Sequence, residues 1–171
     1  MKRLYVLRHA KSSWKDASLA DHDRPLAGRG RRAAKAMARY VRDAGIAPEL
    51  VLCSTALRAR QTLERLEPAL GKRSTRVEAE LYGAGPRALL ERVHAVPDPV
   101  EAVLVIGHNP GLQELVLDLA RPAAARREVE IKFPTCGLAA LECPATRWPD
   151  VRAGEAELVA FVRPRDLEVS G

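Results

Sequence analysis

The order of apolar runs and helical patterns limits the possible folds of this chain more than any other sequence feature. Short apolar runs at residues 3–7, 50–53 and 102–106 each end in polar residues, and segments with helical spacing follow them along the chain. A run of four to eight apolar residues bounded by turn residues is typical of a strand buried on both faces. Repeated strand, turn and helix predicts a mainly parallel sheet with helices on both faces. We therefore expect an α/β fold with three layers, α/β/α.

The remaining elements extend this pattern. Apolar residues at helical spacing predict further helices at residues 31–44, 57–70, 86–93 and about 112–119. A weak strand is expected at residues 75–77, and late antiparallel strands at residues 137–141 and 157–162. We interpret the Ala- and Arg-rich segment 122–130 as a loop, and we expect Ser54 and Thr55 to cap the following helix.

Length and composition indicate one domain spanning residues 1–171. At 47% hydrophobic, the chain has enough apolar side chains for one continuous core. The tail from about residue 163 is expected to be partly mobile, because chain ends that do not pack against the domain are poorly ordered.

The net charge of +6 favours an acidic partner, which leaves nucleic acid, a membrane surface or a phosphorylated substrate. Only 4% of the residues are aromatic, and no zinc-finger or RNP-like pattern appears, which disfavours nucleic acid. No apolar run approaches the roughly 18 residues of a membrane span, and the run at residues 4–7 is too short for a signal-peptide core. We therefore expect neither nucleic acid nor a membrane as partner, and the phosphorylated substrate is expected from the polar residues described below, since charge alone cannot choose among acidic partners.

The cysteines indicate a reducing compartment. Cys53, Cys136 and Cys143 form neither an even-numbered disulfide framework nor a CxxC pair, so neither disulfides nor a zinc site is expected. Cytoplasmic localisation follows as the expectation. Cys53 lies in an apolar run and is expected to be a small core residue.

Polar residues suited to phosphate chemistry follow three of the predicted strands. Arg8 and His9 follow the first strand, residues 54–58 follow the second, and residues 107–109 follow the strand at 102–106. Ligands bind beyond the carboxyl ends of the strands in open α/β sheets. We therefore expect these residues to lie together, although they are far apart in the sequence.

This set of residues suits phosphoryl transfer, which depends on positioning a nucleophile and neutralising charge on the equatorial oxygens. The guanidinium groups of Arg8 and Arg58 can bind phosphate oxygens, and a ring nitrogen of His108 adds a donor. A neutral His9 can attack phosphorus in line and form a phosphohistidine that water cleaves. Glu80 follows the third predicted strand and is the candidate proton donor to the leaving group. No metal is needed for this scheme.

Further polar residues near this edge have two interpretations each. Lys11 and Ser12 follow His9 on a polar loop, where contact with the substrate and simple exposure are equally supported. Arg24 either contacts the substrate, which we slightly favour, or anchors its own loop. His22 is either exposed, which we favour, or a residue at the rim of the site. The basic run at residues 28–32 is most simply a solvated face, with steering of an anionic partner as a second role.

Three motifs of this sequence resemble those of the histidine phosphatase superfamily. They are Leu7-Arg-His-Ala10, Ser54-Thr-Ala-Leu-Arg-Ala59 with Gln61-Thr62, and Gly107-His-Asn-Pro110. The small size, the opening Arg8-His-Ala-Lys-Ser-Ser-Trp14 and the segment Asp23-Arg-Pro-Leu26 resemble the SixA-like phosphohistidine phosphatases in particular. The resemblance covers most of the chain.

The resemblance implies a phosphoglycerate mutase-like fold, no metal and no dissociable cofactor. It also implies His9 as nucleophile, a phosphate pocket of Arg8, Arg58 and His108, and protein phosphohistidine as the substrate. Ala10 departs from the superfamily pattern, in which Gly often follows the nucleophile. Two alternatives stay open: a small-molecule phosphomonoesterase of the same superfamily, and a phosphate-binding module with vestigial catalysis.

Overall fold

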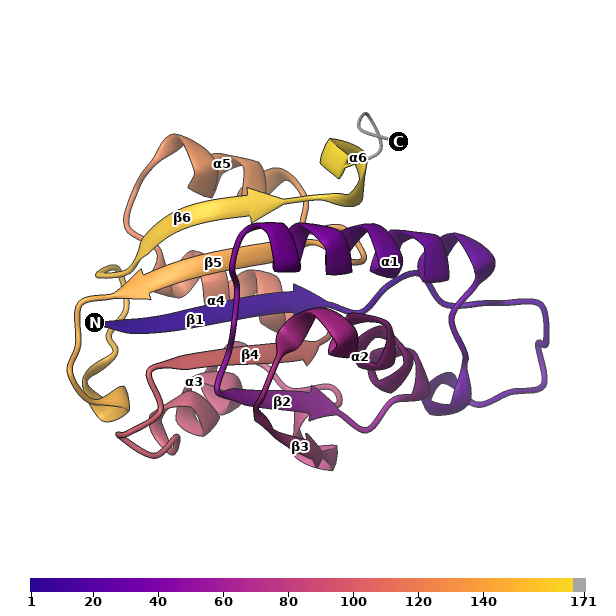
Figure 1. Cartoon of the computed structure of the whole chain (residues 1–171), viewed down its shortest axis with the longest axis horizontal. Coiled ribbons are helices and arrows are strands. Elements are labelled where there is room, and N and C mark those ends of the chain that lie inside the picture. The colour runs from indigo at the N-terminus through magenta and orange to yellow at the C-terminus, as the bar shows by residue number, and fades with distance from the viewer. Residues whose placement is uncertain (168–171) are drawn as a thin grey trace.

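A computed structural model describes residues 1–167 of the chain and contains one six-stranded sheet with the strand order β3-β2-β4-β1-β5-β6 (Figure 1). Its strands are β1 Lys2–Arg8, β2 Leu50–Ser54, β3 Ser74–Glu78, β4 Ala102–Gly107, β5 Leu138–Cys143 and β6 Glu157–Val162. Strands β1 to β4 are parallel, whereas β5 runs antiparallel to both β1 and β6. The sheet is therefore mixed rather than purely parallel, and the predicted antiparallel pairing of the two late strands is confirmed.

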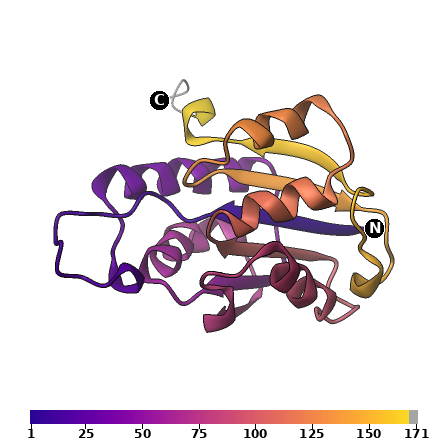
Figure 2. The same ribbon diagram turned by 180° about the vertical axis from the view of Figure 1, so that it is seen from behind.

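Helices cover both faces of this sheet, as the two opposite views show (Figures 1 and 2). One face carries α1 Gly28–Asp43, α2 Leu57–Leu70 and α6 Pro164–Leu167. The other carries α3 Pro86–His94, α4 Gly111–Leu119 and α5 Ala124–Ile131. Three 3-10 turns complete the elements, η1 Asp21–Asp23, η2 Ala79–Leu81 and η3 Trp148–Asp150. The predicted α/β/α layering is confirmed.

Hydrophobic clusters on the two faces explain why the strand runs are continuously apolar. Leu4 and Val6 of β1 belong to the cluster under α3 and α4, whereas Tyr5 and Leu7 belong to the cluster under α1 and α2. Because side chains alternate between the faces of a strand, a strand covered on both sides has no polar face. Cys53 lies fully buried in the second cluster, as predicted.

Three sequence expectations need correction or restriction. The segment 122–130 is not a loop, since α5 occupies most of it; Ala and Arg favour helix strongly, and the helix packs on the core through Val129 and Ala125. Helix α2 begins after Ala56 without a side-chain cap, so the capping role of Ser54 and Thr55 is wrong. The tail that was predicted to be mobile contains the helix α6. The last residues of this tail, 168–171, lie outside the described residues.

No helix within residues 1–167 combines the length and the apolar character needed to cross a membrane.

The start of α1 packs directly against the chain that follows β1, and Gly30 makes this approach possible. The Lys11 carbonyl accepts the Ala27 amide at 2.9 Å, and a Cβ at Gly30 would lie 2.2 Å from that same oxygen. A Cβ at Gly28 would meet only arginine side-chain ends at 3.5 Å. The packing at Gly30 therefore excludes even a methyl group.

We expect Gly30→Ala to lower the free energy of unfolding by about 1–3 kcal/mol, the usual cost of overpacking. Gly28→Ala, the matched control on the same helix, should leave it nearly unchanged. Urea unfolding of both variants measures this difference, and equal stability of the two would contradict the close approach.

Candidate active site

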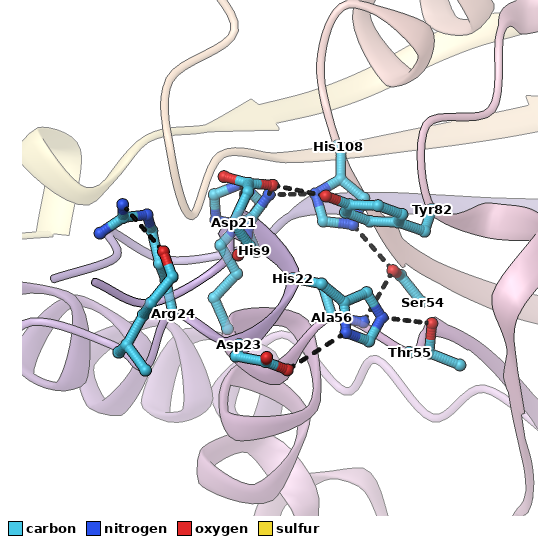
Figure 3. Close-up of polar contacts among 12 residues, drawn as sticks. His9, Asp21, His22, Asp23, Arg24, Ser54, Thr55, Ala56, Tyr82 and His108 are labelled. Carbon is cyan, nitrogen blue, oxygen red and sulfur yellow. Dashed lines mark hydrogen bonds and ion pairs between the residues drawn. The ribbon is translucent and has the colours of Figure 1, made fainter. Parts of the chain in front are cut away.

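The ends of β1, β2 and β4 bring the three sequence motifs together. Strand β4 lies between β1 and β2 in the sheet, so the residues that follow these three strands are neighbours. The imidazole rings of His9 and His108 lie 5.1 Å apart between centroids (Figure 3). Arg58, in the first turn of α2, places its Nε atom 3.3 Å from His9 Nε2 and its Nη2 atom 3.5 Å from His108 Nδ1. The predicted meeting of these residues is confirmed.

Hydrogen bonds determine which nitrogen of His9 carries the proton. Its Nδ1 atom lies 2.7 Å from the Ala10 carbonyl, which can only accept, so Nδ1 is the protonated nitrogen. The Nε2 atom accepts from Arg58 Nε and therefore keeps its lone pair. His9 thus presents an unprotonated nitrogen to the pocket.

Both imidazoles are neutral near pH 7. Burial, only partly offset by the Ala10 carbonyl, lowers the pKa of His9 to about 3, and the nearby charge of Arg58 contributes in the same direction. Burial and the Arg58 charge lower the pKa of His108 to about 4. A neutral imidazole is the nucleophilic form, so the site keeps His9 reactive over the physiological pH range.

Backbone and hydroxyl contacts hold His9 in place from both sides. The buried Thr62 hydroxyl donates to the Arg58 carbonyl at 2.7 Å and accepts the Ala10 amide at 2.9 Å, which ties α2 to the residue after His9. From the other side, the Cys136 amide lies 3.0 Å from the carbonyls of both Arg8 and His9. The histidine is therefore positioned by two separate segments of the chain.

Arg8 supplies a second guanidinium next to His9. Its Nη1 atom donates to the Phe133 carbonyl at 3.0 Å, whereas its Nε atom is buried and has no hydrogen-bond partner within residues 1–167. Burial, together with the charge of Arg58, lowers the pKa of Arg8. Two like charges and a buried free donor favour binding of an anion at this point.

The Ser54 side chain orients His108 instead of capping α2. Its oxygen lies 2.8 Å from His108 Nε2 and accepts the Ala56 amide at 3.2 Å (Figure 3). This contact leaves Nδ1 of His108 on the side of Arg58 and the pocket.

Asp21 and Tyr82 form the outer wall of the pocket. The Asp21 carboxylate accepts from Arg58 Nη2 at 2.9 Å and from the Tyr82 hydroxyl at 2.6 Å (Figure 3). The Tyr82 ring stands edge-on to His108 at 5.3 Å. The Tyr82 hydroxyl and Arg58 lower the pKa of Asp21, so this carboxylate is ionised near neutral pH and orients Arg58 rather than donating a proton.

Comparison with known proteins agrees with this geometry. The model of the histidine phosphatase superfamily, branch 1, matches residues 4–82. An uncharacterised protein of Mycobacterium tuberculosis is 43% identical over 166 residues, which cover 93% of this chain and all of that protein. A solved structure from Nakamurella multipartitia, described as a "putative phosphohistidine phosphatase SixA", is 33% identical, has a TM-score of 0.84, and covers 95% of this chain and 96% of its own. This chain belongs to the histidine phosphatase superfamily.

A second solved relative carries an oxyanion. The protein histidine phosphatase SixA in complex with tungstate is 26% identical to this histidine phosphatase, with a TM-score of 0.79 over 97% of this chain and 99% of that one. These likenesses confirm the resemblance stated from the motifs, and they agree with a phosphoglycerate mutase-like fold with a mixed sheet.

The structure does not bring Glu80 into contact with the two histidines. Glu80 is exposed on η2 and has no hydrogen bond or ion pair with any of residues 1–167. It precedes Tyr82, whose ring contacts His108, by only two positions. Its role in this histidine phosphatase as proton donor therefore stays a proposal.

The loop from residue 10 to residue 27 holds the other predicted substrate contacts. The Lys11 side chain is exposed, and Ser12 forms an isolated antiparallel bridge with Leu26. The buried Arg24 guanidinium donates to carbonyls of its own loop at 3.4–3.5 Å and stacks 3.6 Å from the Trp14 ring. The structure thus favours the loop-anchoring alternative for Arg24.

Sequence reasoning missed two residues at the edge of this site, and for His22 the structure favours the second interpretation, that of a rim residue. Asp21 and Tyr82 were not considered, and His22, expected to be exposed, is partly covered: its Nε2 lies 2.8 Å from the Thr55 hydroxyl, and its ring packs edge-on against Tyr82 at 4.9 Å. The rule that singled out Glu80, its position after β3, applies equally to Tyr82. Nothing in the sequence pattern predicted how the loop with Asp21 folds back on Arg58.

Proposed function

We propose that this chain is a metal-independent phosphatase that carries a phosphoryl group on His9 and hydrolyses protein phosphohistidine. The observation that carries the proposal is the unprotonated, buried Nε2 of His9 beside the guanidinium of Arg58. A SixA relative was solved in complex with tungstate, an oxyanion, which supports phosphate binding by a protein of this fold. The substrate class rests on the likeness to proteins described as phosphohistidine phosphatases.

The proposed reaction has two steps through the same nitrogen. The lone pair of His9 Nε2 attacks phosphorus, and the bond from phosphorus to the substrate nitrogen breaks as that nitrogen takes a proton. The Nδ1 hydrogen bond to the Ala10 carbonyl stabilises the positive charge that grows on the ring. Water then attacks phosphorus, inorganic phosphate leaves, and neutral His9 is restored.

Cations of the pocket stabilise charge on the transferred group in this scheme. Arg8 and Arg58 supply forked donors to the equatorial oxygens. His108 faces Arg58 Nη2 through Nδ1 and the Ser54 hydroxyl through Nε2, so its Nδ1 donates to a phosphate oxygen once the bound phosphate brings a proton to that ring. Within residues 1–167 no three His, Cys, Asp or Glu side chains gather as a metal site. Metal independence is thus part of the proposal and is tested with it.

Glu80 is the proposed proton donor, and its need depends on the leaving group. An alkoxide must be protonated as it leaves, whereas a phosphorylated imidazole leaves readily. We expect Glu80→Gln to lower turnover of an alkyl phosphoester about 10²-fold to 10⁴-fold. Turnover of a phosphohistidine should stay nearly unchanged. Steady-state kinetics on both substrates measure this, and equal losses on both would contradict the assignment.

A substrate panel tests the function as a whole. The intact protein is assayed against a phosphohistidine protein, a free phosphoramidate and small phosphomonoesters, each with and without a chelator. We expect the highest kcat/KM on the phosphohistidine protein and no loss on chelation. Preference for a small phosphoester would favour the phosphomonoesterase alternative, and binding of phosphate without any turnover would favour a binding module. Loss of activity on chelation would overturn metal independence.

We propose the cytoplasm as the location of this protein.

A further inference from the structure

A strongly basic surface groove of about 960 Å³ lies beside the pocket and is not used by the proposed reaction. It runs between the first two turns of α1, the end of α5 with the segment that follows it, and the start of α6. Six cationic side chains line it: Lys11, Arg29, Arg32, Lys132, Arg163 and Arg165. We call this surface the basic groove.

Most of this positive charge is not neutralised. Arg163 pairs with Asp166 at 3.1 Å and with Glu128 at 3.9 Å. The other five cationic residues are exposed and form no ion pair within residues 1–167. Glu128, the sole acidic residue among the described lining, is already engaged with Arg163. Like charges that gather without counter-ions repel each other, so the groove favours an anionic occupant.

The basic groove begins at the backbone of the pocket itself. Lys11 is two residues after His9, and its carbonyl is tied to the start of α1 through the Ala27 amide. The opposite wall, residues 132–135, is held by the Phe133 carbonyl, which accepts from Arg8. Both walls therefore converge at the end of β1, where His9 lies. A ligand that presents its phosphoryl group to His9 can therefore extend from the end of β1 into the groove.

We propose that the basic groove docks an acidic protein surface that surrounds the phosphohistidine delivered to His9. This inference rests on the proposed function and deepens it. Ile131, 85% exposed, and the prolines Pro134 and Pro164 give the groove apolar contacts beside its cations, as protein interfaces have. No aromatic side chain is among its described lining, whereas single-stranded nucleic acids are bound on aromatic platforms.

Charge reversal in the groove tests the proposal. Arg29→Glu with Arg32→Glu is compared with Arg76→Glu and Arg152→Glu, two exposed arginines that form no ion pair within residues 1–167. Arg76 lies on β3, at the far edge of the sheet, and Arg152 in the loop at the opposite end of β1 from His9. Both pairs change the net charge equally. Each protein is assayed on a histidine-phosphorylated domain with an acidic surface and on a free phosphoramidate, and its binding to the unphosphorylated domain is measured.

We expect the groove variant to lose about 10-fold to 10²-fold in kcat/KM on the phosphorylated domain, mainly through KM, with a weakened salt dependence. Its activity on the phosphoramidate should match the wild type, which also reports intact folding, and the control variant should match on both substrates. Equal rates for groove and control variants on the domain would overturn the docking proposal, as would equal losses on both substrates. Displacement of the domain from the groove by a single-stranded RNA oligonucleotide at lower concentration than by the acidic domain itself would also overturn it. If the wild type binds the domain through the groove without hydrolysing it, docking stands and the proposed function fails.

Discussion

Replacing His9 by alanine is expected to abolish the phosphoenzyme and to lower turnover by at least about 10⁴-fold, as loss of a nucleophile does. The neighbouring imidazole of His108 does not substitute for it, because its Nε2 contacts the Ser54 hydroxyl and its Nδ1 faces Arg58 Nη2. Arg8 and Arg58 stay in place and still bind the substrate. The variant should therefore keep substrate affinity and lose the chemical step.

Rapid quenching after addition of a labelled phosphoryl donor tests this directly. The intact protein should carry acid-labile, base-stable label on His9, and His9→Ala should carry none. His94→Ala is the matched control, since His94 lies on α3, and its Nε2 contacts the Val151 carbonyl at 2.8 Å, at the opposite end of the sheet. Turnover or label that survives in His9→Ala would contradict the mechanism.

Replacing Arg58 by alanine is expected to lower kcat/KM by about 10²-fold to 10³-fold, the usual cost of removing one donor that stabilises transition-state charge. Arg58 is 8% exposed and contacts both histidines, whereas the neighbouring guanidinium of Arg8 is held by the Phe133 carbonyl. The substitution also frees the Asp21 carboxylate at the pocket edge, which repels the incoming phosphate and adds to the loss.

Two further variants separate the contributions of charge and shape. Arg58→Lys keeps the charge but loses the fork that reaches His9, His108 and Asp21, so we expect an intermediate loss. Arg65→Ala, on the exposed side of the same helix, should keep full activity. Steady-state kinetics on one phosphoramidate measure all three variants, and an Arg58→Ala enzyme as active as Arg65→Ala would contradict the role of Arg58.

Most of the fold could be predicted from the sequence because its central strands β1, β2 and β4 are buried on both faces. The runs at residues 50–53 and 102–106 appear as β2 and β4 with nearly the expected bounds, and 157–162 matches β6. The helix α5 was missed because its only buried residue is Val129. The helix is only eight residues long, and its largest apolar side chain, Ile131, is 85% exposed, so a loop was the simpler interpretation.

The meeting of His9, Arg58 and His108 followed from topology alone. Each lies just past a strand of the parallel part of the sheet, and strand ends of that kind share one edge. Ser54 was misinterpreted for a related reason. A serine before a helix usually caps that helix, but here the Ser54 hydroxyl forms a hydrogen bond with Nε2 of His108, which follows the neighbouring strand β4.

The sequence by itself determined the layered fold and which strand ends carry the reacting groups, because both depend on the order of apolar runs along the chain. The tertiary structure alone decided the protonated nitrogen of His9, the depressed pKa values of both histidines, and the placement of Asp21 and Tyr82 against Arg58. Those properties depend on burial and on contacts between distant segments, which leave no local pattern in the sequence. The basic groove belongs to the same class, since its arginines and lysines come from four separate parts of the chain.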